Sequence, residues 1–378
     1  MSETLMIVAG ETSGELYGAL LADSLKKRLP GIRIIGIGGE RMKASGVELI
    51  SWISSAFGLT EAVSSLRTIK ETFKKASEAL GVHKPRVLVL IDYPDFNLKL
   101  AAEAKKNNIK VLYYVSPQVW AWRRRRVNKI AKLVDRMAVL LPFEEKIYRD
   151  AGLDCEFVGH PVLDEIRELK KDKSALKRFL GLDENMPLLS LLPGSRPHEL
   201  NSLLPVVLDA VREFKKKFRD FQFCVPFAPN TDINKYSDII DRLKEEGVVI
   251  NKGGSLKALA ASDLAVIASG TASLQAVLLG VPVVVIYKLF PLTYMIGKLI
   301  VKVRHISLVN ILTGQEVVKE LLQSDVTAQN IINESWRIMN DKFYKDRMME
   351  AYGKVHEMFS GRRASERVAE MVEEMAAW

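Results

Sequence analysis

The chain has 378 residues, of which 48% are hydrophobic and 27% are charged, and a formal net charge of +9. This length predicts two globular domains of roughly 150–200 residues, and the charge is consistent with acidic substrates or an anionic membrane. Cys155 and Cys224 have no paired spacing, which argues against a disulfide framework or zinc module and for a reducing compartment. We expect no secretory signal, because the N-terminus lacks a basic region and a long apolar run, and no transmembrane helix, because no apolar run reaches about 18 residues.

Short apolar runs alternate with helical patterns along the whole chain, which predicts two domains built on parallel sheets. The charged stretch 165–178 is the expected linker, and residues 335–378 are helical by pattern. The runs expected to be strands are residues 5–8, 32–37, 87–91, 111–115, 137–141 and 156–158 in the first half, and 188–192, 221–225, 248–251, 264–267 and 281–287 in the second.

The first apolar run leads into a loop with Gly10, Glu11, Thr12, Ser13 and Gly14, and then into a helical pattern. Such a loop leaves backbone N–H groups free to meet an anion. It is neither a Walker loop nor a dinucleotide fingerprint, because the required glycine and lysine spacing is missing. An ordinary tight turn, with Thr12 or Ser13 capping the helix, explains it equally well.

Residues 59–80 place apolar side chains at helical spacing, with lysines and an arginine between them. Two interpretations stay open, an interfacial helix that touches a membrane and an amphipathic helix packed on the core.

Acidic and amide side chains follow the run 87–91. Asp92, directly after the run, is a candidate general base for a hydroxyl nucleophile. We expect Asp95 to cap the helix that follows, and Asn97 lies two residues further on.

Two tryptophans and four arginines follow the run 111–115. Trp120 and Trp122 precede the arginines at 123–126, just past the end of an expected parallel strand, where open α/β sheets bind ligands. Taken alone, this stretch fits nucleic acid, a phosphorylated lipid or a membrane surface.

The five histidines are not spaced as metal ligands, so no metal site is expected. His160 follows an expected strand and either faces a cleft or satisfies a backbone carbonyl. No serine lies in a Gly-x-Ser-x-Gly elbow, which gives a serine hydrolase no support.

Two loops of the second half resemble anion-binding turns. Gly194, Ser195 and Arg196 follow one strand, with Glu199 shortly after, and Arg196 is suited to clamp a phosphate. The second loop, at the start of another helix, contains Ser269, Gly270, Thr271, Ala272 and Ser273. Each loop alone is a common strand-to-helix turn, but two such loops in one domain favour a nucleoside diphosphate as the ligand.

Eight sequence blocks together resemble the lipid-A-disaccharide synthases, glycosyltransferases of the GT-B fold. They are AGETSGE, IDYPDFN, VSPQVWAW with its basic run, LPFE (141–144), FVGHP, LLPGSR, ASGTASL and SLVNIL (307–312), in family order over nearly the whole chain. The resemblance implies two Rossmann-like parallel-sheet domains facing across a cleft. Residues 1–168 would bind the acceptor, residues 169–340 would bind the UDP-sugar, and the helical tail 341–378 would pack back on the first domain.

The resemblance also implies the reaction. An inverting transfer would join UDP-2,3-diacylglucosamine to 2,3-diacylglucosamine 1-phosphate, giving the β-1,6-linked lipid A disaccharide phosphate and UDP, without metal or cofactor. Asp92 would take the proton from the 6-hydroxyl of the acceptor. The enzyme would work on the cytoplasmic side of the inner membrane as a peripheral protein. It would bind no nucleic acid, and whether it forms a homodimer stays open.

The family's site residues carry over to this chain in two groups. The acceptor side would comprise Glu11, Ser13, Asp95, Asn97, Trp120, Trp122, Arg123 and His160, and the UDP side Gly194, Ser195, Arg196, Glu199, Ser269, Gly270, Thr271, Ala272, Ser273, Gln275 and Asn310.

Two features depart from the family's pattern. Gln275 stands where relatives with this fold often carry a glutamate that receives the ribose hydroxyls, and an amide is a weaker acceptor. The segment 59–80 is more polar than a membrane-inserting helix, because Ser64, Ser65 and Thr68 interrupt it.

Three alternatives remain beside this prediction. Another GT-B enzyme, a UDP-N-acetylglucosamine transferase or epimerase, would use a water-soluble substrate. A nucleic-acid binder would stack bases on the two tryptophans, but it leaves Asp92 and Arg196 without a task, as does a membrane-surface scaffold. The arginines at 124–126 either face an anion or form the solvated side of the next helix.

Overall fold

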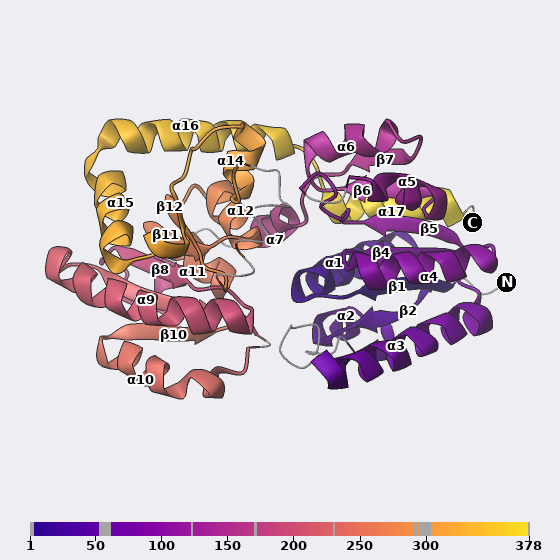
Figure 1. Cartoon of the computed structure of the whole chain (residues 1–378), viewed down its shortest axis with the longest axis horizontal. Helices are drawn as coiled ribbons and strands as arrows, with labels where there is room; N and C mark the ends of the chain where they lie inside the picture. The colour runs from indigo at the N-terminus through magenta and orange to yellow at the C-terminus, as the bar shows by residue number, and fades with distance from the viewer. Residues whose placement is uncertain are drawn as a thin grey trace. The chain divides into compact units, whose positions relative to one another are not determined.

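The computed structural model describes residues 4–52, 62–121, 124–169, 172–229, 231–290, 294 and 304–376. The chain divides into two compact units, one made of Met1–Asp164 with Gly361–Trp378 and the other of Glu165–Ser360 (Figure 1). Within the described ranges, every helix is too short or too polar to span a bilayer.

The first unit is built on a seven-stranded sheet in the order β3-β2-β1-β4-β5-β6-β7, with every neighbouring pair parallel. The central strands are buried on both faces, which explains their continuous apolar sequences. The strands are β1 (Thr4–Ala9), β2 (Arg33–Gly38), β3 (Glu48–Trp52), β4 (Val87–Ile91), β5 (Lys110–Tyr114), β6 (Arg136–Val139) and β7 (Asp154–Phe157).

The second unit repeats this plan with a six-stranded parallel sheet in the order β10-β9-β8-β11-β12-β13. The prediction of an α/β protein with two parallel sheets is therefore confirmed. The strands are β8 (Leu188–Leu192), β9 (Gln222–Phe227), β10 (Val248–Lys252), β11 (Leu264–Ala268), β12 (Val283–Tyr287) and β13 (Glu320–Leu322).

Helices connect the strands in both units. In the first unit they are α1 (Thr12–Arg28), α2 (Glu40–Ala44), α3 (Ala62–His83), α4 (Pro94–Lys106), α5 (Arg126–Leu133), α6 (Pro142–Arg149) and α17 (Ala364–Ala376), and α7 (Val162–Glu168) contains the boundary. In the second unit they are α8 (Lys173–Phe179), α9 (Pro197–Lys217), α10 (Ser237–Glu245), α11 (Ser255–Ala261), α12 (Thr271–Leu278), α14 (Leu308–Thr313), α15 (Ala328–Asn340) and α16 (Lys342–Phe359), with the 3₁₀ turns η2 (Ile233–Tyr236) and η3 (Gln323–Asp325).

Helix α3 covers most of the segment for which a membrane role was left open. From Arg67 onward, Thr72, Ala76 and Leu80 are buried, and the Phe73 ring makes an edge-on contact with Phe96 of α4 at 5.5 Å. This part is an amphipathic helix packed on its own unit. Residues 59–61, and the side chains of residues 62–66, lie outside what the structure describes.

The expected helical tail is divided between the units. Helix α16 belongs to the second unit, whereas α17, yellow in Figure 1, lies among the purple elements of the first. Val368, Met371 and Val372 of α17 are buried in the core cluster that also contains Leu21 and Leu25 of α1. Helix α17 is therefore part of the hydrophobic core of the first unit.

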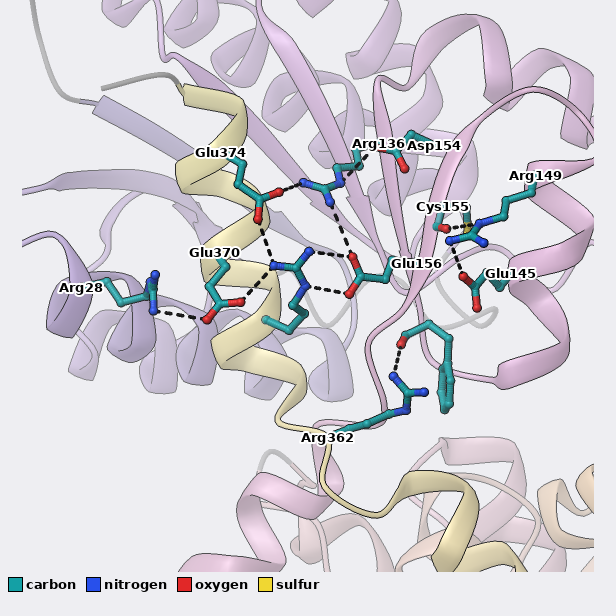
Figure 2. Close-up of polar contacts among 12 residues, drawn as sticks. Arg28, Arg136, Glu145, Arg149, Asp154, Cys155, Glu156, Arg362, Glu370 and Glu374 are labelled. Carbon is teal, nitrogen blue, oxygen red and sulfur yellow. Dashed lines mark hydrogen bonds and ion pairs between the residues drawn. The ribbon is translucent and has the colours of Figure 1, made fainter.

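Ion pairs attach α17 to two strands of the first sheet (Figure 2). The Arg367 guanidinium donates to both oxygens of Glu156 on β7, at 2.6 and 2.8 Å. Arg136 of β6 pairs with Glu156 and with Glu374 of α17, and Arg367 also donates to Glu374 at 3.0 Å. These contacts raise the pKa of Arg367 and lower the pKa values of Glu156 and Glu374.

Candidate functional site

The strand orders define one switch point in each sheet. The order reverses between β1 and β4 in the first sheet and between β8 and β11 in the second, and open α/β sheets bind ligands at the carboxyl ends of such strands. The loops at these four ends are residues 10–13, 92–95, 193–196 and 269–273. They coincide with four of the sequence blocks that carried the family resemblance.

Asp92 lies in a strained turn at the end of β4. Both Asp92 and Tyr93 have left-handed backbones, with φ of 50° and 41°, a conformation that costs of order 1–3 kcal/mol at a non-glycine residue. The Asp92 carbonyl accepts hydrogen bonds from Asn97 Nδ2 at 2.7 Å and from Tyr113 Oη at 2.5 Å. These bonds hold the turn in place, and Asp92 is half-buried at the switch point.

Asn97 belongs to the framework of this turn. Its side chain is completely buried, and Nδ2 also donates to the Ile91 carbonyl at 3.2 Å. A direct contact of Asn97 with the acceptor stays a prediction.

Asp95 does not cap α4, so that expectation is wrong. Pro94 takes the first helical position, Tyr93 is the N-cap residue, and no side chain caps the helix. Instead Asp95 Oδ1 accepts a hydrogen bond from Arg126 Nη2 at 2.6 Å. Of the four arginines, Arg126 thus pairs with a carboxylate, and Arg124 and Arg125 are exposed. Arg123 and the preceding Trp122 lie outside the described residues.

The loop after β1 packs directly against the Asp92 turn. A Cβ atom at Gly10 would come within 2.4 Å of the Tyr93 Cβ, so only glycine fits there. Burial, with the charges of Asp95 and Glu11, raises the pKa of Tyr93 to about 12. Glu11 is the N-cap residue of α1 and makes no capping hydrogen bond, so Ser13 is not the N-cap residue, and the Thr12 side chain lies outside what the structure describes. Ser13 lies half-buried in the first turn of α1.

His160 is a buried, neutral imidazole. Its Nδ1 accepts a hydrogen bond from the Val162 N–H at 3.2 Å, and its ring makes an edge-on contact with Tyr17 at 5.8 Å. Burial lowers its pKa to about 3. It therefore accepts a backbone N–H at the start of α7 through Nδ1, and its role toward the acceptor stays a prediction.

A buried glutamate holds the loop after β8. Glu199 Oε2 accepts the N–H groups of Ser195 at 3.0 Å and Arg196 at 3.1 Å. Gly194 has φ of 103°, and a Cβ there would meet Glu199 Oε2 at 2.2 Å. Glu199 thus shapes the loop and occupies those two backbone donors, while the Arg196 side chain is exposed.

The loop after β11 leads into the N-terminus of α12. Ser269 Oγ donates to the Ile306 carbonyl at 3.0 Å, and Ser273 Oγ donates to the Gly270 carbonyl at 2.7 Å. Gly270 is the N-cap residue without a side-chain cap, and Thr271 and Ala272 form the first, partly exposed turn. The N–H groups of this turn carry the positive end of the helix dipole, which attracts anions.

Two other predicted UDP contacts have partners within the second unit. Gln275 Nε2 donates to Glu165 Oε2 at 3.3 Å. The buried Asn310 side chain makes four hydrogen bonds, with the Val318 carbonyl, Glu320 Oε1 and the N–H groups of Val317 and Val318. Asn310 therefore fixes the segment between α14 and β13.

Sequence reasoning gave no role to Glu144, which the structure places in a polar cluster. The carboxyl is 3% exposed and accepts hydrogen bonds from Ser116, Trp120 and the Leu141 N–H. Burial raises its pKa to about 7. A proline followed two residues later by glutamate, after an apolar run, is a helix-start signal from which this cap was predictable.

Within the described residues, no group of three histidine, cysteine, aspartate or glutamate side chains is arranged to hold a metal ion.

Two parallel-sheet units with these loops at both switch points define an α/β protein of the GT-B class. Solved structures with this fold include the UDP-GlcNAc 2-epimerase from Neisseria meningitidis bound to UDP-GlcNAc. It has a TM-score of 0.69 and 14% identity, over 98% of this chain and all of that one. A glycosyltransferase from Rickettsia africae has a TM-score of 0.56 and 14% identity, over 99% and 98% of the two chains.

A family model described as lipid-A-disaccharide synthetase matches residues 5–372. The lipid-A-disaccharide synthase of Syntrophus aciditrophicus is 44% identical over 374 residues, 98% of this chain and 97% of the relative. That of Geobacter sulfurreducens is 40% identical over 379 residues, 99% and 97% of the two chains. The chain belongs to the lipid-A-disaccharide synthase family.

It is therefore a glycosyltransferase of lipid A biosynthesis, which confirms the activity predicted from the ordered blocks. The epimerase, nucleic-acid-binding and scaffold alternatives are set aside.

Proposed function

We propose that the first unit binds 2,3-diacylglucosamine 1-phosphate and the second binds UDP-2,3-diacylglucosamine. The observation that carries this assignment is the position of the family's motif loops at the switch point of each sheet. The reaction joins O6 of the acceptor to the anomeric carbon of the donor sugar with inversion, and UDP leaves.

Asp92 is the general base in this proposal. Its carboxylate takes the proton of the acceptor 6-hydroxyl as that oxygen attacks the anomeric carbon. The hydrogen bonds of Asn97 and Tyr113 to the Asp92 carbonyl support the role, since a base must be held in one position relative to the hydroxyl. Glu11 and Ser13, in the loop after β1, and Asp95, in the loop after β4, complete the acceptor side. The aromatic loop, residues 115–121 after β5, also belongs to it.

The second unit stabilises the charge that develops on the leaving UDP. The exposed Arg196 guanidinium and the N–H groups at the start of α12 supply positive potential for the diphosphate. Glu199 and Asn310 act by shaping the two loops, because Glu199 Oε2 and Asn310 Oδ1 each accept two backbone N–H groups. Gln275 contacts the ribose, with Glu165 beside it.

An Asp92→Asn variant tests the base directly. We expect kcat to fall about 100- to 10,000-fold, the usual contribution of a general base, while both KM values change little. UDP release is measured with detergent-dispersed substrates. The control is Glu103→Gln, a surface carboxylate of α4 that pairs with Lys106, and it should match the wild type. An Asp92→Asn variant that keeps wild-type kcat excludes Asp92 as the base.

We also propose that the enzyme acts as a peripheral protein at the cytoplasmic face of the inner membrane. Both proposed substrates carry acyl chains, the net charge is +9, and Arg124 and Arg125 are exposed next to the aromatic loop. Basic side chains at a surface are attracted to anionic lipid head groups.

A further inference from the structure

The loop after β5 is fastened by a carboxylate that belongs to the next strand-to-helix connection. Glu144, in the first turn of α6, accepts hydrogen bonds through Oε1 from Ser116 Oγ at 2.8 Å and from Trp120 Nε1 at 3.1 Å. Its Oε2 accepts the Leu141 N–H at 3.1 Å. One buried carboxylate thus links two loops that follow neighbouring strands, β5 and β6.

Capping of α6 explains only half of this arrangement. The cap requires the bond from Leu141 to Oε2, whereas the bonds to Oε1 come from the aromatic loop. Burying a carboxyl is costly unless its oxygens are satisfied by donors, and here each oxygen has them. The Oε1 contacts are therefore a second task of the same side chain.

The aromatic loop is constrained from several other directions. The Trp120 ring makes an edge-on contact with Phe143 at 5.3 Å, and Tyr148 Oη donates to the Pro117 carbonyl at 3.1 Å. Val115, where the loop begins, has φ of 67°, an outlier for a β-branched residue. Such strain persists only where the surroundings enforce it, and it gathers at binding sites.

We propose that Glu144 is a positioning residue for the acceptor, which holds Trp120 and Ser116 in the conformation that the acceptor meets. Glu144 acts through these two side chains and has no contact of its own with substrate. This inference rests on the proposed assignment of the aromatic loop to the acceptor side.

Glu144→Gln is the sharpest single change, because it keeps the shape of the side chain and replaces one acceptor oxygen with an NH2 donor. The single amide oxygen cannot accept hydrogen bonds from both the Leu141 N–H and the donors Ser116 and Trp120, and the NH2 group then faces one of these donors. We expect the acceptor KM to rise about tenfold, the upper end of what one hydrogen bond contributes, with the donor KM unchanged. Trp120→Phe, which removes only the Nε1 donor and part of the ring, should raise the acceptor KM as well. The two changes together should raise it less than the product of their separate effects.

Thr327→Val is the matched control for a lost helix cap, since Thr327 Oγ1 caps α15 in the second unit. It should lower the melting temperature and leave both KM values unchanged. A Glu144→Gln enzyme that is only less stable, with the wild-type acceptor KM, overturns the positioning role. If Trp120→Ala also leaves the acceptor KM unchanged, the assignment of the loop to the acceptor fails instead. The two failures are therefore distinguishable.

Discussion

At the scale of single residues, Gly10 packs closely against the Tyr93 side chain. The glycine backbone at the end of β1 leaves room for the Tyr93 side chain, whose own backbone is left-handed. Any side chain at position 10 displaces the turn that holds Asp92. The position of the proposed base Asp92 thus depends on residue 10, directly after β1, having no side chain.

We predict that Gly10→Ala lowers kcat at least about tenfold and destabilises the fold by about 1–3 kcal/mol, the usual cost of overpacking. The new Cβ would lie 2.4 Å from the Tyr93 Cβ, an atom that cannot move without the backbone. Thermal unfolding and kcat measure the two effects. Gly81→Ala in α3, where a Cβ meets nothing within 4 Å, should instead stabilise the protein slightly. A Gly10→Ala enzyme with unchanged kcat would contradict the role of this contact.

At the scale of elements, the attachment of α17 rests on charge as well as on its apolar face. Arg367 contacts Glu156 of β7 and two glutamates of its own helix, so it neutralises carboxylates that would otherwise repel one another. Arg28 of α1 adds pairs with Glu370 and Glu373.

Arg367→Met should destabilise the protein by about 1–3 kcal/mol, because it removes both hydrogen bonds of a bidentate pair from the partly buried Glu156 and leaves Arg136 as the remaining cation for Glu156 and Glu374. Equilibrium unfolding in urea measures this loss. Arg363→Met is the control, since that guanidinium is largely exposed and pairs with Glu366 on the same helix, and its effect should stay within about 0.5 kcal/mol. Equal effects of the two substitutions would show that the Glu156 contact adds nothing.

The same contacts predict a loss of stability in acid. The pKa values of Glu156 and Glu374 lie below their ordinary value of 4.5, chiefly because of hydrogen bonds from Arg367 and Arg136. A lowered folded-state pKa contributes stability above the unfolded pKa, and this stability is lost as the pH falls through the folded value. The unfolding free energy of the wild type should therefore fall more steeply below pH 4.5 than that of Arg367→Met. Parallel pH profiles would refute this linkage.

The sequence predicted the strands that are buried on both faces, together with the edge strands β7 and β10, and missed the edge strands β3 and β13. The runs at β4 and β11 are continuous apolar stretches and were recognisable as strands. The edge strands β3 and β13 contain Glu48 and Glu320 beside half-buried residues, so they lack that signal. An apolar run predicts a strand, and β10 begins with the apolar run 248–250, whereas β3 and β13 begin with a glutamate.

For the site, the sequence located the loops better than it assigned their side chains. Glu199 and Asn310 were predicted as UDP contacts, which stays a prediction, and the structure shows in addition that Glu199 Oε2 and Asn310 Oδ1 accept backbone N–H groups. The motif shows that a residue belongs to a loop, but only the folded geometry shows which partner its oxygen meets. The contacts of Glu144 Oε1 were not predicted for the same reason, because the two donors, Ser116 and Trp120, lie more than twenty residues earlier in the chain.

At the scale of the whole molecule, the surplus of basic residues bears on the proposed membrane association. Arg124→Glu with Arg125→Glu should weaken binding to vesicles containing anionic lipid at least about tenfold, since each basic residue near such a surface contributes about 1 kcal/mol. Sedimentation with vesicles measures it, and added salt should weaken wild-type binding. Arg242→Glu with Lys244→Glu, the same charge change on exposed positions of α10, is the control. Equal loss in both variants would mean that net charge, rather than this loop, governs binding.

The return of α17 to the first unit also determines when each part of the chain can fold. During synthesis, residues 165–360 leave the ribosome before the helix that completes the core of the first unit has been made. The second unit can therefore reach its native state first, although domains usually mature from the N-terminus. Until residues 364–376 emerge, the apolar side chains of α1, β4 and β5 that pack against α17 lack this helix and are accessible to chaperones.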